Sequence, residues 1–314
     1  MDTPGRTCPV SYRYGARALR GPPQLETDTL WIAGGLYGNT LALQALLDAY
    51  AAEPGRKALV FNGDFHWFDV DSREFELVNE TVLAFLALRG NVETELAAPA
   101  EEAGCGCAYP DWVGDATVAH SNRIIERLRT TARRFPDALE RLARLPMFSI
   151  ARVGEARIAV VHGDADSLAG WGFSQEALAQ PQGRDLARRA LEESQTEVFA
   201  SSHTCLPVLQ DLQNGVVINN GAAGLPNFSS QLFGLATRIS IEPGRDALYT
   251  TRYGALFIEA IALRYDAGAW RERFLAQWPP GSSAHQSYWE RIAKGPAYTM
   301  DQALRVSARF RCPD

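Results

Sequence analysis

Short apolar segments that each end in small or polar residues recur along the chain, and they constrain the fold more than any other feature. The four clearest run into Gly-Gly, Asn-Gly-Asp, His-Gly-Asp and Ser-Ser-His, and they lie at residues 30–33, 58–61, 158–161 and 198–200. Apolar runs of this length between turn residues are typical of buried strands. Helical patterns separate them, so the sequence predicts an α/β fold. Because ligand sites in open α/β folds lie at the carboxyl ends of the strands, we expect the four polar tips to converge.

The stretches between and after these strands predict further elements. Apolar residues at helical spacing predict a helix over 40–51, one or two helices over 116–145, and a helix over 184–193. The run 78–88 fits helical and strand spacing equally. Strand signals dominate residues 206–241, a strand pair is expected around 247–263, and short helices are expected at 269–277, 287–293 and 301–307.

We divide the chain into three parts on these patterns. Residues 1–27 contain four prolines and little periodicity, which predicts an irregular N-terminal arm. Residues 28–263 form the expected main domain, with an insert loop over 94–115 and a helical segment over 116–145. Residues 264–314 are expected to form a C-terminal helical extension.

Composition argues against several classes of protein. No apolar run approaches the roughly 18 residues that cross a bilayer, and the N-terminus lacks the apolar core of a secretory signal. The formal net charge is −6 and the chain has no block of basic residues, so we expect no nucleic-acid partner. Five scattered cysteines do not make a secreted disulfide framework. We therefore predict a cytoplasmic protein without a membrane partner, and the sequence leaves its oligomeric state open.

Five short motifs carry a resemblance to a known family. They read GGLYGN at 34–39, NGDFHWFD at 62–69, RGNVE at 89–93, VVHGD at 160–164 and SSHTC at 201–205, and VVINNGAAGLP follows at 216–226. In this order the region 30–241 resembles the calcineurin-like metallophosphoesterases, whose ligands lie in Asp-x-His, Gly-Asp, Gly-Asn-His-Asp/Glu, lone His and Gly-His-x-His segments. The resemblance implies a four-layer αββα sandwich, here with an N-terminal arm and a C-terminal helical extension.

The resemblance also divides the family's metal ligands into retained and lost positions. One metal would be held by Asp64, Asn91, His162 and His203, all of which are present. At the degenerate positions of the other metal, Gly35, Tyr37 and Cys205 stand in place of Asp, His and His. Because all three losses fall on one metal, the pattern indicates that one site is deleted and the other kept. The retained oxygen and nitrogen ligands suit Zn, Fe, Mn or Ni, so we expect one divalent transition metal, and a second is doubtful.

Two further residues are candidates for catalysis. Val92 stands where the family has its acid, so a proton donor would have to come from elsewhere. His66 lies two residues beyond Asp64 and is expected to point into the same opening. Asn39 is the second candidate, because main-chain amides near it, or near residues 220–221, could steady a phosphate. In the alternative interpretation, Asp64 and Asn91 are simply turn residues.

The cysteines form a separate pattern. Cys105 and Cys107 lie in the insert loop, and Cys205 occupies a ligand position. Three thiolates together would be a soft site for Zn or Cu(I), which makes these residues a possible additional metal or redox site. The alternatives are ordinary thiols or a disulfide.

The leading functional hypothesis is a metal-dependent hydrolase of phosphoesters. Its partner would be a small phosphorylated metabolite or nucleotide, acted on through a single retained metal site. The first alternative is a catalytically inactive protein that binds a phosphate ligand, which the lost ligands and Val92 favour. The second alternative is a metal or redox sensor built on the cysteines.

Overall fold

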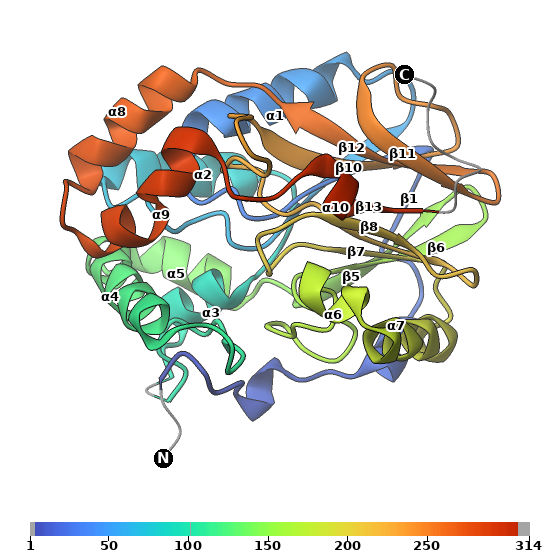
Figure 1. Cartoon of the computed structure of the whole chain (residues 1–314), viewed down its shortest axis with the longest axis horizontal. Helices are drawn as coiled ribbons and strands as arrows, with labels where there is room; N and C mark the ends of the chain where they lie inside the picture. Colours follow the sequence, from blue (N-terminus) through green and yellow to red (C-terminus); the bar gives the residue numbers. More distant parts are fainter. Residues whose placement is uncertain (1–3, 101, 307–314) are drawn as a thin grey trace.

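The computed structural model describes residues 4–100 and 102–306 of the chain, and its framework is a pair of mixed β-sheets (Figure 1). Within the described residues, one sheet has seven strands in the order β1 (Leu25–Thr27), β5 (Phe148–Val153), β6 (Ala156–Val161), β7 (Val198–Ser201), β9 (Val216–Asn219), β8 (Val208–Asp211) and β13 (Leu304–Arg305). The other described sheet has six, in the order β11 (Ala247–Tyr253), β12 (Leu256–Leu263), β10 (Gly234–Ser240), β2 (Thr29–Ala33), β3 (Lys57–Asn62) and β4 (Leu86–Leu88). Strands β2, β3 and β4 run parallel, as do β6, β7 and β9.

The helices cover the outer faces and one end of the sheets. They are α1 (Thr40–Ala52), α2 (Ser72–Val82), α3 (Asn91–Ala97), α4 (Asp115–Ala132), α5 (Pro136–Ala143), α6 (Gln175–Ala179), α7 (Pro181–Ser194), α8 (Ala267–Gln277), α9 (Ser283–Lys294) and α10 (Met300–Ala303). Figure 1 shows α1, α2 and α8 on one side of the sheets and α6 and α7 on the opposite side. Helices α3, α4 and α5 lie together at one end (Figure 1).

The alternation of side chains along the strands explains this layering. In β2, Leu30 and Ile32 join an apolar cluster that contains residues of both sheets, while Trp31 and Ala33 join a cluster with α1 and α2. In β6, alternate residues likewise join the cluster between the sheets and a third cluster with α6 and α7. Because successive side chains of a strand point to opposite faces, both sheets are buried on two sides. The predicted α/β fold is confirmed, and the three clusters separate the layers in the order helices, sheet, sheet, helices.

Several expected elements differ from the observed ones. The arm is not irregular to its end, because residues 25–27 form β1 and pair with β5 in parallel. The ambiguous run 78–88 divides into the end of α2 and strand β4. The last expected helix, 301–307, is replaced by α10 and β13, which pairs with β8; residue 307 itself lies outside the described residues. These edge strands are two or three residues long, too short to produce an alternating pattern.

The four polar tips named from the sequence do converge. Two of them follow β2 and β3 of the six-stranded sheet, and two follow β6 and β7 of the seven-stranded sheet. The loops therefore meet across the packed sheets rather than along one edge. Among the described residues, no helix combines the length and the apolar character needed to cross a membrane.

Candidate metal centre

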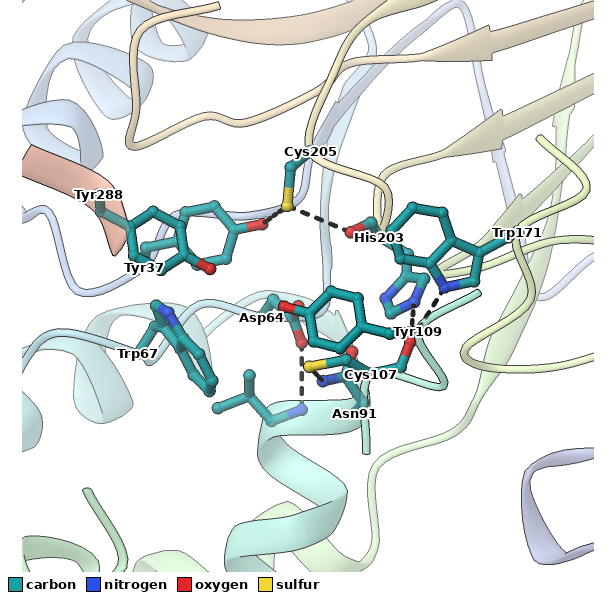
Figure 2. Close-up of a pocket in the computed structure, with 11 residues that line it drawn as sticks. Tyr37, Asp64, Trp67, Asn91, Cys107, Tyr109, Trp171, His203, Cys205 and Tyr288 are labelled. Atoms are coloured by element: carbon teal, nitrogen blue, oxygen red, sulfur yellow. Dashed lines mark hydrogen bonds between the residues drawn. The ribbon is translucent and has the colours of Figure 1, made fainter. Parts of the chain in front are cut away.

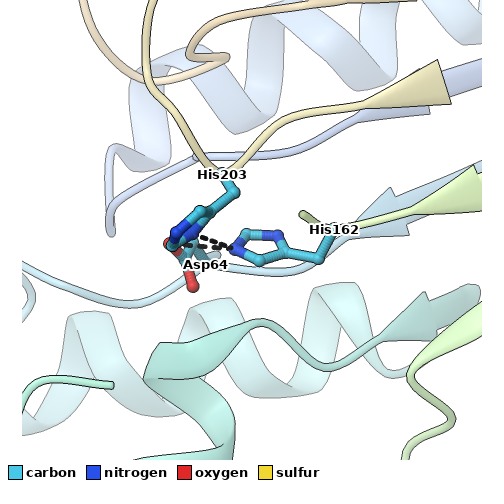
Figure 3. A group of neighbouring side chains, drawn as sticks. All are labelled: Asp64, His162 and His203. Carbon is cyan, nitrogen blue, oxygen red and sulfur yellow. Dashed lines mark hydrogen bonds and ion pairs between the residues drawn. The ribbon is translucent and has the colours of Figure 1, made fainter. Parts of the chain in front are cut away.

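Three buried side chains at the ends of β3, β6 and β7 point toward one another (Figure 3). They are Asp64, His162 and His203, and one ligand atom from each lies within 4.8 Å of the others. His162 Nε2 lies 3.3 Å from Asp64 Oδ2 and 3.3 Å from His203 Nδ1. A carboxylate and two imidazoles at this spacing form a donor set suited to a divalent transition metal.

The outer nitrogen of each imidazole is held by a main-chain carbonyl. His162 Nδ1 donates to Asn62 O at 2.7 Å, and His203 Nε2 donates to Cys107 O at 3.1 Å. These bonds assign the proton of each neutral ring to the outer nitrogen, so both inner nitrogens present lone pairs. Two inner nitrogens 3.3 Å apart are held together by a metal ion beside them or, in its absence, by a proton on His162 Nε2. The hydrogen bonding thus fits a metal ion, and it is the arrangement found around metal-binding histidines.

Asn91 completes the four predicted ligands. Its Nδ2 donates to Cys105 O at 3.0 Å, which turns the amide oxygen toward the histidines. Asn91 Oδ1 lies 3.3 Å from His162 Nε2. The structure therefore brings all four predicted metal-binding residues to one place, with Asn91 at the start of α3 and the others on loops after strands.

Burial and neighbouring charges set the protonation of the cluster. Burial and, to a smaller extent, the charge of the adjacent His162 lower the pKa of His203 to about 4. Burial also acts to lower the pKa of His162, but the charge of Asp64 and the hydrogen bond to it raise this pKa above its usual value. The pKa of Asp64 is lowered, since the two histidines outweigh the opposing effect of burial. His203 is therefore neutral and Asp64 ionised at pH 7, as metal ligands must be, whereas the raised pKa of His162 means that an ion must displace a proton from it.

A buried carboxylate that we did not single out from the sequence holds the Asp64 segment in place. Glu93 accepts hydrogen bonds from the main-chain nitrogens of Asp64, Phe65, His66 and Gly90, at 2.8 to 3.3 Å. Asp64 has a φ of 51°, a conformation that few residues other than glycine adopt. Glu93 stabilises this turn, and its position as the last residue of the RGNVE motif was the signal that could have identified it.

The positions of the lost ligands are filled by a tyrosine and a cysteine. A Cβ built on Gly35 would lie 3.0 to 3.1 Å from the ring and hydroxyl of Tyr37. Tyr37 Oη in turn lies 2.8 Å from Cys205 Sγ, and both residues have positive φ, at 55° and 64°. The Tyr37 ring thus occupies the space into which a side chain at position 35 would extend. Within the described part of the chain, the Asp64–His162–His203 group is the one whose ligand atoms could share an ion.

A small cavity opens beside the cluster and is walled largely by aromatic rings (Figure 2). Its volume is about 40 Å³. Its lining comprises Tyr37, Asp64, Trp67, Asn91, Val92, Cys107, Tyr109, Trp171, His203, Cys205 and Tyr288. His162 is fully buried and is not among these lining residues. One water needs roughly 10–15 Å³ of such volume, so the cavity has room for about three small groups.

The predicted cysteine site is only partly assembled. Cys107 and Cys205 line the cavity, whereas Cys105 is buried outside its lining. All three are free thiols, so the disulfide alternative is wrong for the described chain. Burial raises the pKa of Cys107 and of Cys205, which keeps both protonated and disfavours a thiolate metal site.

The two residues predicted to take part in catalysis have structural contacts instead. His66 is fully buried, with its Nδ1 2.5 Å from Asp69 Oδ2 and its ring stacked on Phe75, and it is not part of the cavity lining. The expectation that it points into the opening is therefore wrong. Asn39 caps α1 through bonds from Leu41 N and Ala42 N.

The main-chain amides that were expected to steady a phosphate are also occupied. The amides of Gly38 and Asn39 donate to Phe65 O and Leu36 O. The amides of Asn220 and Gly221 donate to Ser201 O and to the side chain of Asn219. None of these four described amides is free to hold a phosphate.

Comparison with solved structures identifies the class of fold. A hypothetical protein from Pyrococcus horikoshii OT3 superposes with a TM-score of 0.59 at 15% identity, covering 87% of this chain and 100% of that one. A metallophosphoesterase from Sphaerobacter thermophilus superposes with a TM-score of 0.54 at 16% identity, covering 85% of this chain and 100% of that one. No family model and no curated protein sequence matches the chain.

The chain therefore has the metallophosphoesterase fold, and the resemblance drawn from its motifs is confirmed at the level of the fold. Its candidate site is a buried Asp/His/His cluster with an adjacent asparagine.

Proposed function

We propose that the protein is a metal-dependent phosphoesterase that works through a single metal site. One observation carries the proposal: the buried Asp64, His162 and His203 each offer a ligand atom within 4.8 Å of the others, with both imidazoles oriented by main-chain carbonyls. A divalent ion at this position supplies Lewis acidity toward a phosphoryl oxygen and lowers the pKa of water. The metallophosphoesterase fold of the Sphaerobacter thermophilus protein supports the same reaction class.

In this proposal the side chains of the protein hold and orient the ion and its ligands, and none of them is assigned a proton transfer. Asp64, Asn91, His162 and His203 would hold the ion, and Asn62 O and Cys107 O fix the orientation of the two imidazoles. The aromatic walls exclude bulk water from the cavity, which strengthens every charge interaction inside it. Val92 lines the cavity where the family has its acid, so we expect good leaving groups to react much faster than poor ones.

A second candidate function is a ligand-binding protein that holds the metal without turnover. The Tyr37 ring favours it, because it fills the space beside Asp64 where the family places a second ion. Both candidates predict metal binding, and they differ in whether an aryl phosphate is hydrolysed.

The test is hydrolysis of 4-nitrophenyl phosphate and bis(4-nitrophenyl) phosphate by the chelator-treated protein, before and after Zn²⁺ or Mn²⁺ is added. We expect hydrolysis only after metal is added. We expect the Asp64→Asn and His203→Ala variants to lose this activity, because a site of four ligands has none to spare. His285→Ala is the matched control, since His285 stacks on Trp289 outside the cavity lining. Metal binding without hydrolysis of either ester would reject the enzyme and favour the binding protein.

A further inference from the structure

We propose that the substrate is a small phosphodiester with an aromatic ester group, a singly charged phosphate, rather than a doubly charged phosphomonoester. The inference deepens the proposed function and rests on it. Its basis is the charge and the aromatic character of the cavity walls.

No lysine or arginine side chain among the described residues lines the cavity, and Asp64 is the acidic residue of its described lining. Arg291 lies behind the wall, where its Nη2 donates to Cys205 O at 2.7 Å and its Nε donates to Pro226 O at 2.8 Å. On the other side of Asp64, the Glu93 carboxylate accepts a hydrogen bond from the main-chain nitrogen of Asp64 at 2.8 Å. Both groups lie outside the cavity lining and are hydrogen-bonded to main-chain atoms.

The charge balance then depends on the ion and Asp64. Asp64 carries one negative charge, and the other three ligands are a neutral amide and two imidazoles. With a single divalent ion the site has a net charge of +1. A phosphodiester anion neutralises it, whereas a monoester dianion leaves one negative charge unpaired among buried aromatic rings. Unpaired charge in such surroundings is strongly unfavourable.

The absence of a second ion follows from the same residues. A second divalent ion would raise the site charge and suit a dianion, but the Tyr37 ring and Cys205 occupy that position. The tyrosine thus selects the charge of the substrate as well as the number of metal ions.

Aromatic surface continues from the cavity to the solvent. Trp171 lines the cavity, packs on His203 with ring centroids 5.6 Å apart, and is fixed by a bond from Nε1 to Cys107 O at 3.0 Å. The Trp112 ring lies 6.3 Å from it and is 62% exposed. Because the cavity of about 40 Å³ holds little beyond a phosphoryl group, an ester group must lie outside, against Trp171 and Trp112. Aromatic groups bind such a surface best.

The first test compares binding of three phosphates to the Zn²⁺-loaded protein by calorimetry at pH 8. Diphenyl phosphate and phenyl phosphate differ in charge and both carry phenyl rings, two in the diester and one in the monoester, while dimethyl phosphate has the diester charge without rings. We expect diphenyl phosphate to bind at least about tenfold more tightly than either of the others, and none to bind the metal-free protein. Equal or tighter binding of phenyl phosphate, or no binding of diphenyl phosphate, would overturn the charge argument. Equal binding of dimethyl phosphate would overturn the aromatic one.

The second test replaces Trp112. Trp112→Ala should weaken diphenyl phosphate binding by roughly 2- to 12-fold, raise KM for bis(4-nitrophenyl) phosphate, and leave kcat unchanged. Leu186→Ala, on α7 and 60% exposed, is the control. Equal weakening for dimethyl phosphate would mean that Trp112 has only a structural role and would overturn its assignment.

The two proposals fail in distinguishable ways. Faster hydrolysis of the monoester than of the diester would reject the phosphodiester inference and leave the phosphoesterase intact. Tight binding of diphenyl phosphate without hydrolysis of any ester would reject the enzyme and leave the ligand preference intact.

Discussion

At the scale of single residues, strained backbone marks the site. Among the described residues, seven that are not glycine have positive φ, and three of them, Tyr37, Asp64 and Cys205, line the cavity. Such conformations cost about 1–3 kcal/mol each and persist only where the surroundings impose them. Here the Glu93 carboxylate and the Tyr37–Cys205 contact provide that constraint. The strain aims Asp64 at the histidines and turns Tyr37 back over Gly35.

The Tyr37 ring predicts a specific non-additivity. Gly35→Asp alone should destabilise the protein by about 2–4 kcal/mol, because residue 35 has positive φ and its Cβ meets the ring. In a Tyr37→His background the same change should cost at least about 1 kcal/mol less. Urea unfolding of the two single variants and the double variant measures this coupling. Additive costs would show that the ring does not fill the space of the lost ligand.

At the scale of elements, the repeated strand–loop pattern could be predicted and its irregular parts could not. The four ligands were identified through the family motifs, and Asp64, His162 and His203 also follow strands with a clear apolar pattern, whereas Asn91 follows the ambiguous run 78–88. His66 was misplaced because the left-handed turn at Asp64 redirects the chain, so a residue two positions later points into the core. The hydrogen bond from His203 to Cys107 O could not be predicted from the sequence either, since every residue has a main-chain carbonyl.

The N-terminal arm connects the two loops that wall the cavity. Gly5 exchanges main-chain bonds with Ala103 and Tyr109 of the insert loop, at 2.9 Å each. Further along the arm, Tyr12 O accepts a hydrogen bond at 3.0 Å from Leu168 N, and Leu168 lies in the loop that leads to Trp171. Arg6 donates to Pro110 O at 2.8 Å and to Val113 O at 2.6 Å. The arm therefore holds the loop whose Cys107 carbonyl orients His203.

Removing the Arg6 contacts should loosen that loop. We expect Arg6→Ala to increase hydrogen exchange over residues 103–113 and to weaken Zn²⁺ binding severalfold, because hydrogen bonds from a charged group contribute about 1.5–3 kcal/mol. Arg17→Ala is the control, since the Arg17 side chain is 81% exposed. Unchanged exchange over 103–113 would show that the arm does not secure the loop.

At the scale of the whole molecule, the candidate metal centre joins the two sheets. Asp64 and Asn91 follow strands of the six-stranded described sheet, and His162 and His203 follow strands of the seven-stranded one. An ion held by all four links the loops of both halves, so it stabilises the native state by an amount that grows with its concentration. Folding of the two sheets and assembly of the site are thus coupled.

The number of bound ions tests the account most directly. The protein is loaded with excess Zn²⁺, freed of unbound metal by gel filtration, and analysed by mass spectrometry for zinc per chain. The account predicts one ion per chain, because Asp64, Asn91, His162 and His203 form one site and the Tyr37 ring fills the other. Two ions per chain would show that the second site persists, and none would show that the facing histidines do not hold a metal.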